Sequence, residues 1–84
     1  MSKKEKLVQK IRNNPKAVSF DDLDSVLVWY GFVKRSSRSG TSHVYYTLGI
    51  HQISVPYRRP YVKEVYVRQV LEILDQIDEE QEAL

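Results

Sequence analysis

Apolar residues recur at helical spacing near both ends of the chain. Leu7, Val8 and Ile11 form a narrow stripe, which predicts a lysine-rich helix that docks through these three residues and ends before Pro15. We prefer this docking role to a dedicated RNA clamp. A broader apolar pattern over residues 62–77 predicts a last helix that is widely buried, and any exposed remainder would offer a protein-binding patch. Its core positions are expected to be Val67, Val70, Leu71, Leu74 and Ile77, widened by Val65, Tyr66 and Ile73.

Another helix is predicted in the first half of the chain, where residue types mark both its start and its end. Ser19 is a favoured N-cap residue, and Asp21 and Asp22 follow in the first turn, where carboxylates suit the positive end of the helix dipole. Gly31 stands where a left-handed C-terminal cap is expected. Together with Asp24 these carboxylates could suggest a metal site, but helix-start electrostatics explain them, and we expect no metal. The buried stripe is expected to comprise Phe20, Leu23, Val26, Leu27 and Tyr30.

Between these helices the pattern changes to the alternation of β-strands. Strands are predicted over residues 32–36, 43–48 and 51–55, with a polar loop over 36–41. The pair Gly49-Ile50, with glycine first, is typical of a type II′ hairpin turn, which fixes the register of the last two strands. In this register the facing residues are Leu48 and His51, Tyr46 and Ile53, and Val44 and Val55.

The alternation gives the predicted sheet one apolar face and one polar face. The helices should pack against the apolar face, which leaves the polar face open to solvent or to a ligand. The open face is expected to carry His43, Tyr45, Thr47, Gln52 and Ser54.

The predicted order of elements is α-α-β-β-β-α, which indicates an α+β fold with a three-stranded antiparallel sheet and helices on one face. The last five elements have the layout of a double-stranded-RNA-binding domain. With 84 residues, of which 42% are hydrophobic, the chain is long enough for one small domain. We divide it into an N-terminal helical extension over residues 1–17, a core over 18–77 and an acidic tail over 78–84, which is expected to fray or to shield the basic body weakly.

The formal net charge is +2, but the charged residues are unevenly distributed along the chain. Residues 1–16 and the middle of the chain are basic, whereas residues 75–84 carry acidic side chains and no basic one. A basic body favours an anionic partner such as nucleic acid, through phosphate contacts and counterion release.

Composition also narrows the cofactors and the compartment. The chain has no cysteine and only two histidines without clustered carboxylates, which argues against a disulfide framework and against a zinc site. No apolar run approaches the roughly 20 residues of a membrane span, and no signal-peptide hydrophobic region follows the lysine-rich start. We therefore expect no cofactor, no metal, no membrane contact and a cytoplasmic location.

The candidate for chemistry is His43, which opens a strand directly after the polar loop. An imidazole can act as a general acid or base near neutral pH. In the predicted register His43 lies beside Pro56 and the segment 57–59, whose arginines and tyrosine suit a phosphodiester. His51 falls at the other end of the hairpin, roughly 16 Å away at about 3.3 Å per residue, so the two histidines cannot form an acid–base pair. Candidate RNA-binding residues are Lys34, Arg35, Arg38, Tyr45, Tyr57, Arg58 and Arg59.

Five segments carry a family resemblance through their order and spacing. They are Phe20–Leu23, Tyr30–Phe32, Gly40–Tyr46, Ile53–Pro56 and Tyr61–Leu74. Together they resemble the HicA toxin family, which consists of bacterial mRNA interferases of type II toxin–antitoxin systems. The resemblance covers about residues 18–75, and the helix before it resembles an extension of some longer members.

The resemblance implies an RNA-cleaving enzyme with a double-stranded-RNA-binding-like fold, inhibited by direct contact with a HicB-type antitoxin. The family's essential histidine belongs to a glycine-serine-histidine motif, and the matching residue in this chain is His43. The chain departs from the motif in two places. Gly40 stands three residues ahead with Thr41 inserted, and Val44 replaces the second histidine of many members.

The hypothesis that follows is metal-independent cleavage of mRNA, in which His43 is the acid or base and Arg58, Arg59 or Arg38 stabilises charge on the phosphate. Two alternatives of other classes stay open. One is a non-catalytic RNA-binding module, in which His43 only caps a strand and binding depends on salt without any product. The other is a protein-binding role, in which the basic surface meets an acidic partner.

Overall fold

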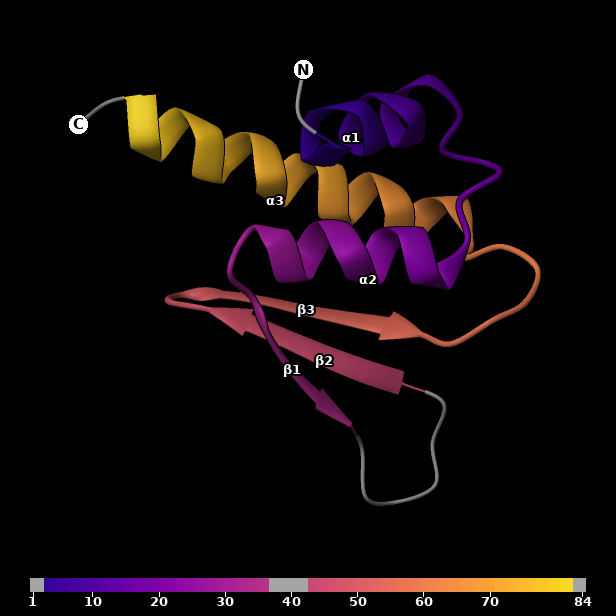
Figure 1. The fold of residues 1–84 in the computed structure, drawn as a ribbon. Coiled ribbons are helices and arrows are strands. Elements are labelled where there is room, and N and C mark those ends of the chain that lie inside the picture. Colours follow the sequence, from indigo (N-terminus) through magenta and orange to yellow (C-terminus); the bar gives the residue numbers. More distant parts are fainter. Residues whose placement is uncertain (1–2, 37–42, 83–84) are drawn as a thin grey trace.

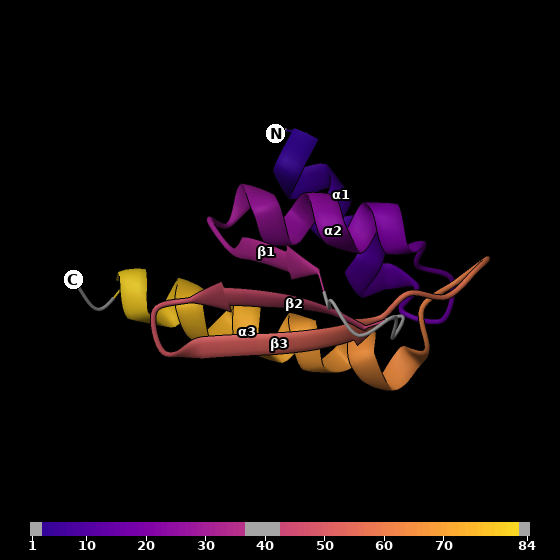
Figure 2. The ribbon, with the colours of Figure 1, turned by 90° about the horizontal axis from the view of Figure 1, so that it is seen from below.

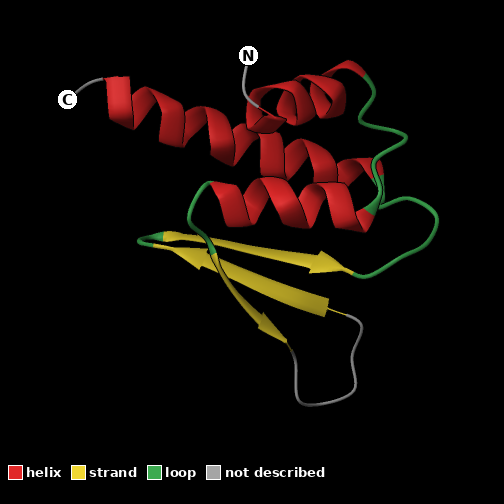
Figure 3. Cartoon of the chain, viewed as in Figure 1, coloured by secondary structure: helices red, strands yellow, loops and turns green. Residues whose placement is uncertain are grey.

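Helices lie over one face of a three-stranded sheet and leave its other face uncovered (Figures 1 and 3). The computed structural model describes residues 3–36 and 43–82. The elements are α1 (Lys3–Asn13), α2 (Phe20–Trp29), β1 (Val33–Ser36), β2 (His43–Leu48), β3 (His51–Pro56) and α3 (Glu64–Glu82). The strands are antiparallel in the order β1-β2-β3. The predicted α+β fold and its order of elements are therefore confirmed.

Helix α2 begins and ends where its capping residues indicate. The Ser19 hydroxyl accepts a hydrogen bond from the backbone N–H of Asp22 at 3.2 Å, which satisfies one of the free donors of the first turn. Gly31 has a φ of +100°, and the Phe32 N–H donates to the Leu27 carbonyl at 3.1 Å, the bond of a Schellman motif. Because Phe32 is held in this cap, the first strand begins at Val33, one residue later than predicted.

The β2–β3 hairpin has the predicted register. Gly49 has a φ of +58°, and no non-glycine residue in the described part of the chain has a positive φ, as a type II′ turn at Gly49-Ile50 requires. Leu48 then pairs with His51, and the pairing continues to His43 opposite Pro56. The predicted facing pairs are all confirmed, so the two faces of the hairpin are assigned correctly.

The last helix differs from its prediction at both ends. The prediction placed it over residues 62–77, whereas α3 begins at Glu64 and runs without a break to Glu82. The expectation that the chain frays after Ile77 is wrong for residues 78–82, which are helical. The Tyr30 hydroxyl, at the C-cap of α2, donates to the Asp78 carboxylate at 3.2 Å and supports this part of the helix.

No helix among the residues 3–36 and 43–82 has both the length and the apolar character needed to cross a membrane.

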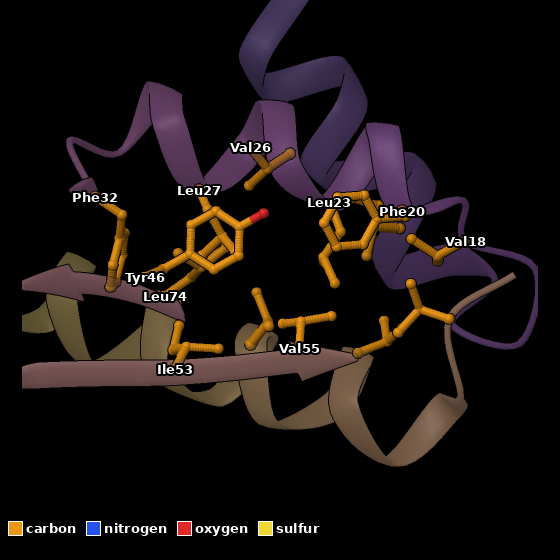
Figure 4. Close-up of a cluster of buried hydrophobic side chains, with 14 of the residues drawn as sticks. Val18, Phe20, Leu23, Val26, Leu27, Phe32, Tyr46, Ile53, Val55 and Leu74 are labelled. Atoms are coloured by element: carbon orange, nitrogen blue, oxygen red, sulfur yellow. The ribbon is translucent and has the colours of Figure 1, made fainter. Parts of the chain in front are cut away.

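Apolar side chains from all three helices and from the sheet meet in one core (Figure 4). Tyr46 and Ile53 of the sheet point toward Leu27 of α2 and Leu74 of α3 (Figure 4). Burying one such large apolar side chain contributes about 1.5–3 kcal/mol relative to leaving it exposed. The residues with no exposed surface are Val26, Leu27, Val55, Val67, Val70 and Leu74.

Helix α1 packs on the outer side of α2, away from the sheet (Figures 1 and 2). It docks as predicted, because Ile11 is buried in the core cluster and both Leu7 and Val8 pack against that cluster. Arg12 also forms an ion pair with Asp75 of α3. The hydrogen bond from Arg12 to the Asp75 carboxylate, together with the negative charge of that carboxylate, raises the pKa of Arg12.

Candidate active site

A cleft of about 330 Å³ opens at the edge of the sheet where β2 begins and β3 ends. It is lined by His43, Pro56, Tyr57, Arg58, Lys63 and Tyr66. These side chains come from three separate parts of the chain, namely the first residue of β2, the end of β3 with the loop after it, and the start of α3. The cleft therefore combines one imidazole with two cationic and two phenolic side chains.

His43 owes its position in the cleft to the hairpin register. It pairs with Pro56 as the last pair of the β2–β3 ladder, and its neighbour Val44 faces the helices with Val55. The His43 side chain is half-buried, so it remains accessible from the cleft. No hydrogen bond or ion pair joins its ring to another of the described residues, which leaves both ring nitrogens available to a ligand within that part of the chain.

The loop after β3 is fixed against the start of α2. The Val62 N–H donates to the Val18 carbonyl at 2.8 Å, and the Tyr57 ring meets the Phe20 ring edge-on with centroids 4.9 Å apart. The Arg59 guanidinium folds back within the loop and donates to the Tyr57 hydroxyl. These contacts hold the segment 57–62 at the mouth of the cleft.

A second, smaller hollow of about 160 Å³ lies on the other side of this loop, against the start of α2. It is lined by Ser19, Phe20, Asp21, Tyr57, Arg58, Arg59 and Pro60. Tyr57 and Arg58 thus line both hollows, whereas Arg59 lines only the second. Of the two neighbouring arginines, Arg58 is the one that shares the cleft with His43.

Three further predicted RNA-binding residues, Lys34, Arg35 and Tyr45, do not line the cleft. Arg35 and Tyr45 face each other across β1 and β2, on the same open face of the sheet as His43. Lys34 faces the helices instead, because alternate residues of a strand point to opposite sides. Its ammonium lies 3.1 Å from Asp24, so it is partly engaged in an ion pair. Arg38 lies outside the described residues.

Two residues of the cleft, Lys63 and Tyr66, are absent from the predicted site. The Lys63 carbonyl accepts the backbone N–H groups of Tyr66 at 3.0 Å and Val67 at 3.3 Å, so α3 starts directly after Lys63. Tyr66 was predicted as part of the broad apolar face of this helix, and its partly buried ring does pack against the core. The signal available in the sequence was a lysine and a tyrosine soon after the basic loop. Their approach to His43 depends on where α3 crosses β3.

The second histidine, His51, takes no part in the cleft. It lies at the turn end of β3, opposite Leu48, while His43 lies at the other end of the hairpin. Its side chain is only 12% exposed, and its Nε2 atom is 3.4 Å from the Glu80 carboxylate of α3. The predicted separation of the two histidines is confirmed.

The acidic residues at the start of α2 are engaged in contacts within the fold. Asp22 pairs with Lys10 of α1 at 3.3 Å. Asp24 pairs with Lys34 and accepts a hydrogen bond from the Tyr46 hydroxyl at 2.6 Å. Among the described residues, no three histidine, cysteine, aspartate or glutamate side chains gather closely enough to hold a metal ion.

Comparisons of the chain with protein-family models, with curated proteins and with solved structures found no match. The resemblance to the HicA family and the likeness to double-stranded-RNA-binding domains therefore stay predictions from the sequence. The function has to be argued from the side chains that meet in the cleft.

Proposed function

We propose that the protein is a ribonuclease that cleaves mRNA, with His43 as its catalytic acid or base, and that it acts as the toxin of a HicA-type toxin–antitoxin system. The observation that carries the proposal is the cleft in which His43 meets Arg58 and Lys63. An imidazole beside two cations is a combination suited to an anionic substrate whose reaction transfers protons.

The reaction begins with attack of a ribose 2′-oxygen on the neighbouring phosphorus. The new bond between the 2′-oxygen and phosphorus forms while the bond to the 5′-oxygen breaks, which yields a 2′,3′-cyclic phosphate and a 5′-hydroxyl end. The 2′-hydroxyl loses one proton and the departing 5′-oxygen gains one, so the step consumes no other reactant. His43 carries one of these proton transfers, and His51 cannot carry the other because it lies at the far end of the hairpin.

The cations of the cleft act on the charge that builds up on phosphorus. Arg58 can hold two non-bridging phosphate oxygens with its planar guanidinium, and Lys63 adds a point charge. Both contribute more as negative charge concentrates on these oxygens in the transition state.

The first experiment compares His43→Ala with His51→Ala on a single RNA substrate. General acid–base catalysis is worth about 10²- to 10⁴-fold, so we expect His43→Ala to lose activity by this factor. His51→Ala is the matched control, since it removes the same side chain from the other end of the same hairpin. A substrate with a 2′-deoxyribose at the cleavage site should resist the wild-type protein. Equal cleavage by wild type and His43→Ala would contradict the catalytic role.

A non-catalytic RNA-binding module is the second candidate function. The open face of the sheet favours it, because Arg35 and the exposed Tyr45 lie there side by side next to His43. This candidate predicts RNA binding that weakens with salt, with no cleavage product and no effect of His43→Ala on RNA integrity.

The partner and the compartment follow from the proposed toxin role. A HicB-type antitoxin is proposed as the inhibitory partner on the strength of the family resemblance, and acidic residues on that partner would complement the cations of the cleft. The proposed mRNA substrate places the protein in the cytoplasm.

A further inference from the structure

The cleft beside His43 has an aromatic wall in addition to its charged rim. The Tyr57 ring is 41% exposed, and its edge-on contact with Phe20 fixes its position. Tyr66 is partly buried and rests against the core, so its ring too is held in place, and Pro56, directly before Tyr57 in the chain, also lines the cleft. Rings that are immobilised before binding lose little entropy when a flat ligand stacks on them.

The two cationic side chains of the cleft have no carboxylate partner in the described chain. Neither Arg58 nor Lys63 forms an ion pair with another residue in the ranges 3–36 and 43–82. Four other cations are paired with carboxylates, namely Lys10 with Asp22, Arg12 with Asp75, Lys34 with Asp24, and Arg68 with Glu64. Within the described chain, the two cations next to His43 are therefore free to meet the charge of a ligand.

The size of the cleft limits what can enter it. Its volume of about 330 Å³ lies near the lower end of the range for small-ligand sites, about 300–1,000 Å³. One nucleotide fits a space of this order, and a base-paired segment does not. A stacking wall next to a charged rim also matches the two halves of a nucleotide, its base and its phosphate.

The chemistry of cleavage sets a second requirement. Attack by the 2′-oxygen needs that atom, phosphorus and the departing 5′-oxygen in line, and such alignment contributes much of the rate in phosphate cleavage. The regular A-form duplex keeps its bases stacked inside, and its backbone is not aligned in this way. An unstacked nucleotide can reach the geometry, and enzymes that act on one nucleotide commonly take it out of the stack.

We infer that the cleft binds one unpaired nucleotide, with its base against Tyr66 and Tyr57 and its phosphate between His43, Arg58 and Lys63. The substrate class of the proposed ribonuclease is then single-stranded RNA, and this inference rests on the proposed function. It runs against the preference for duplex RNA that the double-stranded-RNA-binding layout would otherwise favour.

The test measures binding with the His43→Ala protein, so that cleavage does not consume the ligand. A fluorescently labelled single-stranded RNA is titrated alone and after annealing to its complement. We expect the single strand to bind at least about tenfold more tightly than the duplex, and base–aromatic stacking supplies a factor of that order. Equal or tighter binding of the duplex overturns the inference.

Variants of two tyrosines locate the base. Tyr66→Leu keeps an apolar side chain against the core but removes the ring, and we expect it to weaken single-strand binding by about 5- to 150-fold, as for loss of one stacked base. Tyr66→Phe should bind like the parent protein. Tyr61→Leu is the matched control, because Tyr61 is 48% exposed and lines neither hollow. Equal effects of Tyr66→Leu and Tyr61→Leu overturn the assignment, and thermal unfolding verifies that each variant is folded.

Lys63→Gln provides an independent readout of the phosphate contact. The slope of log affinity against log salt should fall by about 0.7 for single-stranded RNA, as for the loss of one phosphate contact. An unchanged slope would show that Lys63 does not contact the phosphate.

Two outcomes separate this inference from the proposed function. Tight single-strand binding without any cleavage by the wild type would contradict the ribonuclease activity but support the binding site. Cleavage of duplex RNA alone would support the ribonuclease activity but contradict the single-stranded substrate.

Discussion

Arg58 and Arg59 are adjacent in the sequence but have different surroundings. Arg58 lines the cleft with His43, whereas the Arg59 guanidinium is bonded to the Tyr57 hydroxyl and lies 5.6 Å from the centre of that ring. In the proposed mechanism, transition-state stabilisation requires a group that can reach a phosphate beside His43. Arg58 meets this condition, and Arg59 supports the position of Tyr57.

Replacing each arginine in turn by glutamine tests this division. A hydrogen bond to a charged group contributes about 1.5–3 kcal/mol, so Arg58→Gln should lower kcat/KM for RNA by about 10- to 150-fold. Arg59→Gln should lower it less than about threefold, since exposed hydrogen bonds to neutral groups contribute little. Initial cleavage rates measured at one salt concentration give the comparison. Similar losses of kcat/KM in both variants would contradict the assignment of transition-state stabilisation to Arg58 rather than Arg59.

The part of the site that the sequence predicts is the part that depends on strand register. His43 beside Pro56 follows from the two-residue turn at Gly49, and Arg58 follows from its distance along the chain from Pro56. Lys63 and Tyr66 could not be predicted, because their approach to the cleft depends on the packing of α3 against the sheet.

At the scale of elements, the sheet is tied to α2 by polar contacts to Asp24 as well as by apolar packing. Tyr46 of β2 is almost fully buried, and its hydroxyl donates to Asp24 of α2. Burial is the main cause that raises the pKa of Tyr46 above its usual value, and the hydrogen bond to the Asp24 carboxylate raises it further. Burial and Asp78 likewise raise the pKa of Tyr30, which joins α2 to α3.

These raised pKa values predict a loss of stability in alkali. In the unfolded chain a tyrosine ionises near pH 10, whereas the fold favours the neutral form. The contribution to stability is therefore complete below about pH 10 and is lost as the pH rises above it toward the folded pKa. Urea unfolding at pH 8 and pH 11 should show a fall in the free energy of unfolding that is smaller in Tyr46→Phe. The fall should not vanish, since Tyr30 remains; an identical fall in both proteins would contradict the role of Tyr46.

Local chemistry explains why some element boundaries are predictable and others are not. Ser19 and Gly31 determine the ends of α2 through hydrogen bonds to near neighbours, so their residue types suffice. The end of α3 is different, because residues 78–82 carry four carboxylates at the C-terminal end of the helix, where negative charge is unfavourable. Their helix is supported by Tyr30 and His51, which approach from other elements.

At the scale of the whole molecule, α1 packs into the same hydrophobic core as the other helices and the sheet. Ile11 is 2% exposed, and α1 meets α2 on the side away from the sheet (Figure 2). The residues that line the cleft come from β2, β3, the loop after β3 and the start of α3, and none comes from α1. The N-terminal helix therefore belongs to the stability of the fold rather than to the cleft.

Ile11→Ala should lower the free energy of unfolding by about 2–5 kcal/mol, because the substitution leaves a cavity in the core. Lys6→Ala on the exposed side of α1 serves as the control, with an expected change within about 0.5 kcal/mol. Urea unfolding followed by circular dichroism measures both. A change below about 1 kcal/mol in Ile11→Ala would mean that α1 is only loosely attached.

Helix α3 extends from the rim of the cleft to the acidic end of the chain. Its 19 residues span roughly 27 Å at 1.5 Å per residue, with Lys63 just before its first turn and four carboxylates in its last five residues. The charges at the two ends of α3 are thus held apart by a rigid rod, and α3 contributes an electric dipole along its axis. In the field of a polyanion such a molecule is rotated before contact, so it arrives with the cleft foremost, and added salt weakens this orientation.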